Sequence, residues 1–413
     1  MMTRVLLLGM LISVFVLVGC GQQTEVVQEQ TKTEFIPPAT VIPDTPVPNT
    51  PMPTIKPTIK PTTIEAPKIK KKESQLPKPP LGKSDKNRPT PPLMVKQSDR
   101  IKAAASKYSL IGTIQFELDN PEIVTMEQMN SGSIVGPSVV QLLNGQYRMY
   151  LQSRPKGYPR LIDGYDITHI VSLISDDAIT WEIEPGVRIE HGGVDDLDYQ
   201  AGEPEAFIGE EDKYYMAYTG RYLGVDEGSG KDQLMHRILF ATSDDGLEWT
   251  KTGTHFAGEL RNDFASSADV TLIDDEYVIY YSGGRAIAST TSADGLNWKK
   301  GSLLFDFGHD STVLEYEDNY YMFLKVPKEF YYEKNPELEK DILGMVMSED
   351  GVNWSKEFYQ VVVNDEYGDE IPVFELQDPG SVTLSDGSFR VYLNSNKGAS
   401  IYSIKPSEVL PIP

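Results

Sequence analysis

The sequence predicts an all-β protein, a five-bladed β-propeller that follows a disordered tether rich in Pro, Thr and Lys. A short signature recurs four times and contains all four tryptophans of the chain: SDDAITW (Ser175–Trp181), SDDGLEW (Ser243–Trp249), SADGLNW (Ser292–Trp298) and SEDGVNW (Ser348–Trp354). Each signature, called here a tryptophan box, follows an alternating Tyr-rich stretch: YRMYL from Tyr147, YYMAY from Tyr214, YVIYY from Tyr277 and YYMFL from Tyr320. A fifth such stretch, FRVYL from Phe389, has no box after it.

Each repeat can be divided into four strands with period-two alternation and turn residues between them. In the second repeat, GEPEAFIG from Gly202 is the expected inner strand, followed by KYYMAYTG, HRILFATS and LEWTKTG. Three boxes contain the Asp-Gly pair that favours a tight hairpin with positive φ, whereas the first has Ala178, so that turn should differ or be strained.

The fifth repeat lacks its outer strand, and Gly112–Leu118 is the candidate that closes the ring from the other end of the chain. We expect the box tryptophans to pack against the neighbouring blade; stacking on a sugar is the alternative.

The first hundred residues predict export and attachment rather than a folded domain. Residues 1–20 have a basic start at Arg4, an apolar run from Val5 to Val18 that is too short to span a bilayer, and LVGC at Leu17–Cys20. This LVGC resembles the lipobox of bacterial lipoproteins, which implies lipidation of Cys20, the one cysteine of the chain. Residues 21–105 read as a Pro-rich linker and 106–413 as the propeller. The expected location is the outer face of the bacterial cell membrane.

Charge divides in the same way as the organisation. Residues 1–100 contain 14 Lys and Arg against 8 Asp and Glu, and the remainder contains 24 against 53, a net charge of −29. An acidic folded part argues against a nucleic-acid partner. Nothing in the pattern predicts a partner subunit, so a monomer is expected.

Candidate chemistry lies on the five expected inner strands, VGPSVV from Val135, GEPEAF from Gly202, SADVTL from Ser267, GHDSTV from Gly308 and QDPGSV from Gln377. Inner strands of a propeller converge on a central channel, so their side chains should meet at one mouth. The residues expected there are Glu203, Glu205, Asp269, His309, Asp310 and Asp378. Crowded carboxyl groups push their pKa values apart, which is what acid/base catalysis of glycoside hydrolysis requires.

A second expected set is cationic and follows the second strand of each repeat: Arg154, Arg221, Arg285, Lys325 and Lys397. These side chains could bind an anionic substituent of a ligand, or they could be ion-pair partners of the same carboxylates. The five histidines are scattered and there is one cysteine, so no transition-metal site is expected, although Ca²⁺ could bind in an acidic channel.

The inner strands DPGSV and EPEAF, the stretch YYMAYTG and the box SDDGLEW resemble the five-bladed furanosidase-like glycoside hydrolases of families 43 and 32 and their family 130 relatives. The likeness covers about Gly112 to Val409 and implies a carbohydrate ligand. Family 43 enzymes place a catalytic Asp on the first inner strand, where this chain has Gly136. The boxes also resemble the Asp-boxes of sialidases, which have six blades.

The resulting hypothesis is a surface-anchored glycosidase with its acid and base drawn from Glu203, Asp269, Asp310 and Asp378, and with Glu205, Arg154, Arg221, Arg285, His309 and Lys325 binding substrate. A propeller that binds a glycan without cleaving it is the alternative, and Gly136 is the observation that favours it. A phosphorylase is a third hypothesis, in which Arg221, Arg285 or Lys325 would hold inorganic phosphate.

Overall fold

The computed structural model describes residues 106–157, 166–193, 195–225, 232–256, 264–330, 341–371, 377–395, 398–411 and 413. Chain contacts divide the protein into two units, Met1–Lys86 and Asn87–Pro413, and all described residues belong to the second. The signal sequence, Cys20, the whole predicted linker (residues 21–105) and Lys397 lie outside the described residues. Within the part that the structure describes, no helix has the length and apolarity needed to span a bilayer.

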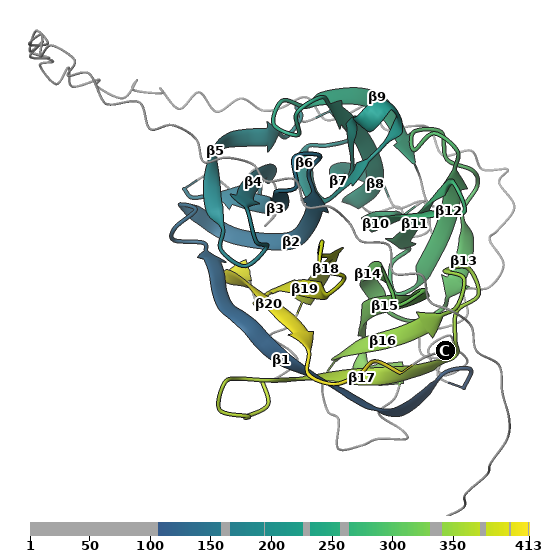
Figure 1. Cartoon of the computed structure of the whole chain (residues 1–413). Helices are drawn as coiled ribbons and strands as arrows, with labels where there is room; N and C mark the ends of the chain where they lie inside the picture. The colour runs from purple at the N-terminus through teal and green to yellow at the C-terminus, as the bar shows by residue number, and fades with distance from the viewer. Residues whose placement is uncertain are drawn as a thin grey trace, which may run out of the picture. The chain divides into compact units, whose positions relative to one another are not determined.

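The described residues form β-strands and two short 3-10 helices, and the sheets are arranged around a centre as in a propeller (Figure 1). The expected all-β propeller is confirmed. Three sheets have four antiparallel strands each: β2 (Ser131–Gln141), β3 (Tyr147–Pro155), β4 (His169–Ser175) and β5 (Glu182–Ile189); β6 (Gln200–Ile208), β7 (Tyr214–Val225), β8 (Asp232–Ser243) and β9 (Thr250–Phe256); and β10 (Ser266–Ile273), β11 (Glu276–Ser282), β12 (Ile287–Ser292) and β13 (Ser302–Phe305).

The remaining strands form one eight-stranded sheet in the order β14-β15-β16-β17-β1-β20-β19-β18. Its strands are β14 (His309–Tyr316), β15 (Asn319–Val326), β16 (Ile342–Ser348), β17 (Glu357–Asn364), β1 (Ser109–Thr125), β20 (Ser400–Pro406), β19 (Phe389–Asn394) and β18 (Gln377–Thr383). The 3-10 helices are η1 (Glu210–Asp212) and η2 (Lys328–Phe330). We call the four-strand groups that begin with β2, β6, β10, β14 and β18 groups 1 to 5.

The first strand joins the two ends of the propeller. Antiparallel pairing of β1 with β20 runs from Phe116 to Thr125, so β1 supplies the outer strand that group 5 lacks, as expected. The pairing with β20 continues beyond Leu118, where the expected segment ended. The earlier part of β1, Ser109 to Glu117, pairs instead in parallel with β17 of group 4. One strand thereby covers the open edges of two groups.

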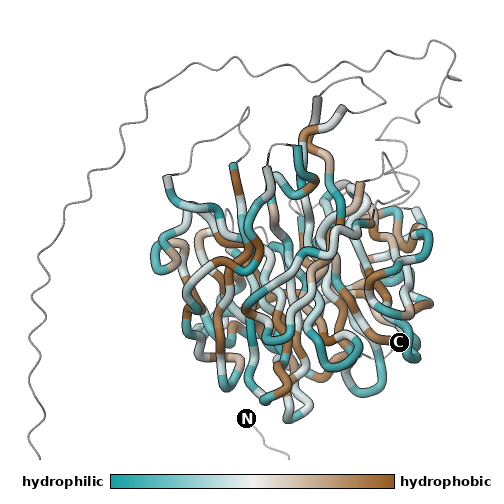
Figure 2. Tube along the Cα trace, turned by 90° about the horizontal axis from the view of Figure 1, so that it is seen from above, coloured by the Kyte–Doolittle hydropathy of each residue, from teal (hydrophilic) through white to brown (hydrophobic). Residues whose placement is uncertain are grey.

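Five hydrophobic clusters each fill one interface between neighbouring groups, including the interface between groups 5 and 1. Figure 2 shows the same pattern, with hydrophobic stretches inside the body and hydrophilic turns at its ends. The ring is therefore held together by side chains that alternate along every strand, which is why the period-two pattern was informative.

The box tryptophans pack against the preceding group, as the sequence predicted. Trp249 meets Tyr150, Trp354 meets Tyr280, and Trp181 meets Tyr392 across the closing interface, with the rings 83–89° apart. The hydroxyls of these three tyrosines also donate hydrogen bonds to main-chain carbonyls of the boxes, those of Gly246, Gly351 and Ala178.

One interface differs. Group 2 has Ala217 at the register where groups 1, 3 and 5 have a tyrosine, and Trp298 of the next box lies flat on Phe240 instead, at 14°. The turn at Ala178 keeps the shape of the glycine turns, with φ +59°, so it is strained rather than different.

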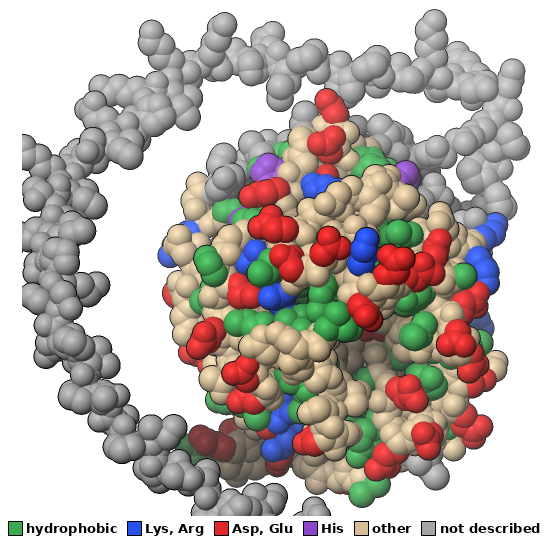
Figure 3. Space-filling model, turned by 45° about the horizontal axis from the view of Figure 1, so that its top comes forward, with side chains coloured by type: hydrophobic (Ala, Val, Ile, Leu, Met, Phe, Trp, Pro, Cys, Tyr) green, Lys and Arg blue, Asp and Glu red, His purple; other side chains and the backbone are tan. Residues whose placement is uncertain are grey.

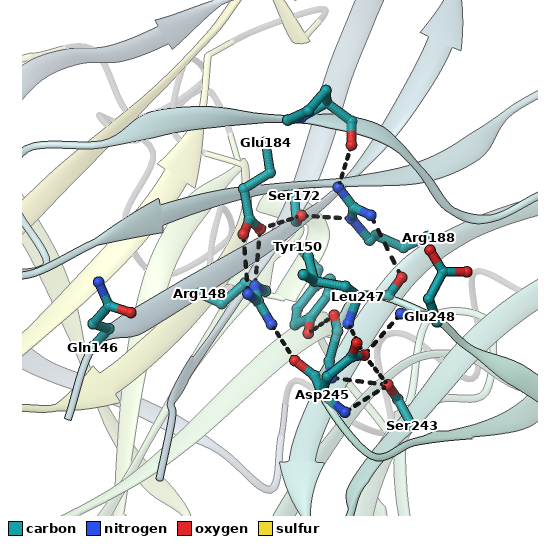
Figure 4. Close-up of polar contacts among 12 residues, drawn as sticks. Gln146, Arg148, Tyr150, Ser172, Glu184, Arg188, Ser243, Asp245, Leu247 and Glu248 are labelled. Carbon is teal, nitrogen blue, oxygen red and sulfur yellow. Dashed lines mark hydrogen bonds and ion pairs between the residues drawn. The ribbon is translucent and has the colours of Figure 1, made fainter. Parts of the chain in front are cut away.

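A buried polar network adds to the interface between groups 1 and 2 (Figure 4). Arg148 on β3 donates two hydrogen bonds to the carboxylate of Glu184 on β5, at 2.8 and 3.0 Å, and a third to the carbonyl of Asp245 in the next box, at 2.8 Å. Ser172 donates to the same carboxylate and accepts from Arg188. The side chains of Arg148 and Glu184 are thus largely buried, and both have further hydrogen-bond partners. Removing one member of such an ion pair lowers the free energy of unfolding strongly.

Candidate active site

Each inner strand contains a β-bulge at the same register. The pairing shifts between Val135 and Ser138, Gly202 and Glu205, Ser266 and Asp269, His309 and Ser311, and Gln377 and Gly380. One residue of every bulge has positive φ: Gly136 (+63°), Glu203 (+44°), Ser267 (+47°), Asp310 (+50°) and Asp378 (+47°). Such angles are uncommon outside glycine, and bulges re-aim side chains beside active sites. These five equivalent positions are called the first ring.

The bulges correct the alignment of the inner strands made from sequence. The predicted single cluster is two rings, because Glu205 and Asp269 lie two residues further along their strands than the first ring. The second ring contains Ser138, Glu205, Asp269, Thr312 and Gly380. In groups 3 and 4 the predicted register was wrong by one residue, because Ser266 and His309, and not Ser267 and Gly308, occupy the paired position before the bulge. Ser267, not Asp269, is therefore the first-ring residue of group 3.

Both rings line one small cavity in the centre of the propeller. Its volume is about 30 Å³, and its walls include Glu203, Asp310 and Asp378 of the first ring, Glu205 and Asp269 of the second, and the prolines Pro137, Pro204 and Pro379. That volume accommodates one or two water molecules and not a sugar ring. A ligand much larger than water would therefore bind over the first ring, outside the cavity.

Two carboxyl groups of the first ring have opposite electrostatic environments. Burial raises the pKa of Asp378 to about 7, and the charges of Asp310 and Glu203 add to the shift. Burial acts in the same direction on Asp310, but the charge and hydrogen bond of His309 outweigh it and hold the pKa of Asp310 well below its usual range. At neutral pH the mouth therefore contains one carboxyl group poised to hold a proton beside one that is ionised.

His309 and two serines fix the position of Asp310. Nδ1 of His309 lies 2.6 Å from Oδ2 of Asp310, and the hydroxyl of Ser267 donates to Oδ1 at 2.9 Å. The main-chain N–H of Asp310 donates to the hydroxyl of Ser282 at 2.8 Å. Burial would lower the pKa of His309, but the neighbouring Asp310 raises it above the ordinary value. The sequence placed His309 at the mouth, and the structure adds the hydrogen bond that defines what it does there.

Glu203, the third carboxyl group of the first ring, is paired with a cation. Nη2 of Arg221 on β7 contacts Oε1 of Glu203, and Nη1 donates to Oε1 of Gln152 at 3.1 Å. Oε2 of Glu203 accepts the main-chain N–H of Ser267 at 3.2 Å. A Cβ added at Gly136 would lie 3.4 Å from Cα of Glu203. Glycine at that position thus brings the main chain of group 1 close to Glu203 and leaves group 1 without a side chain on the first ring.

The second ring holds buried carboxyl groups that favour protonation. Asp269 is 5% exposed and accepts a hydrogen bond from Thr312 at 2.8 Å. Burial raises its pKa to about 7. Burial and the nearby Asp269 raise the pKa of Glu205 well above its usual range. These two groups lie beneath the mouth and keep negative charge below it low at neutral pH.

Most carboxyl groups have a lowered pKa in the folded state, so they make the free energy of unfolding rise with pH. A raised carboxyl pKa has the opposite effect. Between about pH 4 and pH 7 the folded protein retains the proton of Asp269 and the unfolded chain does not, so the free energy of unfolding should fall as pH rises. We expect Asp269→Asn to flatten this dependence and to be more stable than the unaltered protein above pH 7. Denaturant unfolding at pH 5 and pH 8 measures it; an equal change at both pH values would contradict it.

The predicted ring of cations is not a ring. Arg154 and Arg221 are equivalent, paired with Ser133 and Gln200 at the ends of their hairpins, whereas Lys325 lies opposite His309, two residues nearer the bulge. Arg285 lies in the exposed turn between β11 and β12. Arg154 pairs with Asp166 at 2.6 Å. Arg221 and Lys325 are therefore the two predicted cations that the structure brings closest to the first ring.

Sequence reasoning missed a set of neutral residues that support the bulges. Main-chain N–H groups of the first ring donate to side chains of the preceding group: Gly136 to Asn394 at 3.2 Å, Ser267 to Thr219 at 3.0 Å and Asp310 to Ser282 at 2.8 Å. All three acceptors lie opposite the residue that precedes a bulge. Small polar residues recur at one register of the second strands, which could have indicated this support. The recurrence is recognisable only after the strands are aligned on their bulges.

No metal centre can be assigned. In the ranges that the structure describes, no group of three or more His, Cys, Asp or Glu side chains could hold a metal ion. The first ring instead balances its carboxylates with Arg221 and His309.

Comparison with known proteins places the fold. No family model matches the chain, and no curated protein matches it. Among solved structures, one reported under the GH130 family of mannoside phosphorylases, said to contain glycoside hydrolases that target β-1,2 mannosidic linkages in Candida mannan, is 15% identical. It matches with a TM-score of 0.53 over 74% of this chain and 99% of its own.

Two further structures agree. A glycosyl hydrolase from Bacteroides ovatus is 14% identical with a TM-score of 0.54, over 74% of this chain and all of its own. Zg3597, a family 117 glycoside hydrolase from Zobellia galactanivorans, is 16% identical with a TM-score of 0.52, over 72% of this chain and 93% of its own. The protein thus has the propeller fold of furanosidase-like glycoside hydrolases. At these identities the likeness defines the fold and not the reaction.

Proposed function

We propose that the protein is a glycoside hydrolase in which Asp378 acts as the acid and Asp310 as the ionised partner. The observation that carries the proposal is the opposite environment of these two first-ring carboxyl groups, one raised to a pKa of about 7 and one held ionised by His309. Glycosidases use such a pair across the scissile bond, one to protonate the leaving oxygen and one to act on the other side of the sugar. The propeller fold of the similar structures supports a glycan as substrate.

Each residue at the mouth would have a separate role in the reaction. Asp378 would donate its proton to the glycosidic oxygen, and Asp310 would activate water or attack the anomeric carbon, with His309 keeping it charged. Glu203 with Arg221 would hold hydroxyl groups of the sugar over the ring. Asp269 was predicted as a catalytic candidate, but it lies in the second ring and accepts a hydrogen bond from the hydroxyl of Thr312. Its role would be to limit the negative charge below the mouth.

The test is hydrolysis of a panel of aryl furanosides and pyranosides and of arabinan, fructan, mannan and sialoside oligomers, with and without inorganic phosphate. Turnover without phosphate supports the hydrolase. Turnover that requires phosphate would replace it with a phosphorylase. Glycan binding with no turnover on any substrate would favour the second candidate, a binding propeller, for which the missing side chain at Gly136 is the specific observation.

We further propose that the protein is attached to the outer face of the cell membrane through lipidated Cys20, on the strength of LVGC at Leu17–Cys20 and the Pro-rich residues after it. Buried acyl chains contribute about 0.8 kcal/mol per CH₂, so two or three chains suffice for stable attachment. We expect Cys20→Ser to move the protein from the membrane fraction to the soluble fraction. Retention in the membrane fraction would argue for an uncleaved apolar segment instead.

A further inference from the structure

The supports of the first ring follow a rule that one group breaks. At the register that precedes each bulge, the second strands carry Gln152, Thr219, Ser282, Lys325 and Asn394. Three of them accept a main-chain N–H of the next group, as described above. Gln152 also acts as an acceptor, for Arg221. Lys325 is the exception, because an ammonium group has three donors and no lone pair to accept with.

The position of Lys325 places its charge beside the proposed acid. Lys325 pairs across the strands with His309. In groups 2, 3 and 5 the residue at this register reaches the first ring of the following group. For group 4 the following group is group 5, whose first-ring residue is Asp378. Its charge acts on both Asp310 and Asp378, lowering the pKa of each. Support of the bulge does not explain a lysine at this register.

Lys325 is also the most loosely paired of the cations near the mouth. Arg154 has a carboxylate oxygen at 2.6 Å and Arg221 is in contact with Glu203. The ion pair that the structure gives Lys325 is with Asp341 at 4.0 Å, and the side chain of Asp341 is 39% exposed. The side chain of Lys325 is 21% exposed. Because the pair is long and partly open to solvent, a ligand anion can replace Asp341 at a smaller cost than it could replace the partners of Arg154 or Arg221.

From this geometry we infer that Lys325 binds a carboxylate carried by the substrate, and that the glycan is therefore an acidic one with a uronic acid next to the scissile bond. The inference rests on the proposed glycoside hydrolase function. An anionic substituent is disfavoured around most of the first ring, where Glu203, Asp310 and Asp378 face the ligand. Of Arg154, Arg221 and Lys325, Lys325 has the most distant carboxylate oxygen in its printed ion pair, so a substituent bound there would also set the orientation of the sugar.

The experiment compares uronic-acid-containing oligosaccharides with the same oligosaccharides after carboxyl reduction, using the full chain. We expect the ratio of kcat/KM for acidic over reduced substrate to fall about 10- to 100-fold in Lys325→Gln, the effect of one lost charged hydrogen bond. Lys356→Gln, an exposed lysine before β17, is the matched control and should leave the ratio unchanged. Equal activity on acidic and reduced substrates, or preference for sulfated oligosaccharides, would overturn the inference.

Binding measured by calorimetry separates this inference from the proposed function. If no glycan is hydrolysed, Lys325-dependent binding of the acidic oligosaccharides but not of the reduced ones would keep the binding of a uronic acid at Lys325 while removing the hydrolase. If neutral glycans are hydrolysed and Lys325→Gln weakens binding of both forms equally, the hydrolase would stand and the inference would fail. Inorganic phosphate that competes with the acidic oligosaccharide and supports turnover would also overturn it, because the anion at Lys325 would then be a co-substrate.

Discussion

Replacement of Asp378 by Asn should lower kcat by about 10²–10⁴ and leave the fold intact. The amide has nearly the same shape as the carboxyl group but has no proton to give to a leaving oxygen. Because Asp378 lies on a bulge with φ +47°, a conformation that Asn adopts readily, the change should not strain the main chain. Initial rates on whichever glycan the panel identifies, with circular dichroism as the check on folding, measure the effect.

The pH profile adds an independent reading of the same residue. A pKa of about 7 means that Asp378 is protonated below pH 7 and loses its proton above it, so activity should decline as pH rises through 7. The basic limb should disappear from the residual activity of Asp378→Asn. Asp318→Asn, an exposed change in the β14–β15 turn, is the control and should keep both rate and profile. A full rate in Asp378→Asn would exclude this residue as the acid.

Replacement of Arg148 by Met should reduce the free energy of unfolding by about 3–5 kcal/mol. The change removes three hydrogen bonds at once and leaves the carboxylate of Glu184, whose side chain is 13% exposed, without its cation (Figure 4). It also releases the carbonyl of Asp245 and so weakens the contact between groups 1 and 2. Chemical denaturation at pH 7 is the measurement.

The control for this prediction is the double change Arg148→Met with Glu184→Leu. Replacing both members of a buried ion pair by apolar side chains is often nearly neutral, so the double variant should recover most of the lost stability. A double variant as unstable as the single one would mean that the contact of Arg148 with the next box, and not the uncompensated carboxylate, accounts for the loss. A loss below about 1 kcal/mol in the single variant would show that water reaches Glu184.

The surface of the folded part is consistent with its acidic composition. Acidic side chains are spread over the whole face shown in Figure 3, with fewer basic ones between them. Two of the predicted cations, Arg221 and Lys325, lie near the first ring, so a count of charges over the whole surface does not describe the charge at the mouth. Charge on the remainder of the surface affects solubility and the rate at which ligands approach.

The sequence alone determined the fold. Period-two alternation, the tryptophan boxes and the fifth incomplete repeat are local patterns, and each corresponds to one strand, one turn or one interface contact. Even the closing strand could be predicted, because an incomplete repeat at one end requires a strand from the other. The residues that meet at the mouth were also identifiable as a set, since inner strands of a propeller converge.

Tertiary structure alone decided how those residues are related. The position of each bulge is defined by the strand pairing. The division into two rings, the place of Ser267, and the separation of Lys325 from Arg154 and Arg221 therefore became visible only in the structure. The raised pKa of Asp378 depends on burial and on the charges of Asp310 and Glu203. The lowered pKa of Asp310 depends above all on the contact with His309, which outweighs burial. Burial and contact distance are properties of the folded chain, and residues of the same type acquire different chemistry through them.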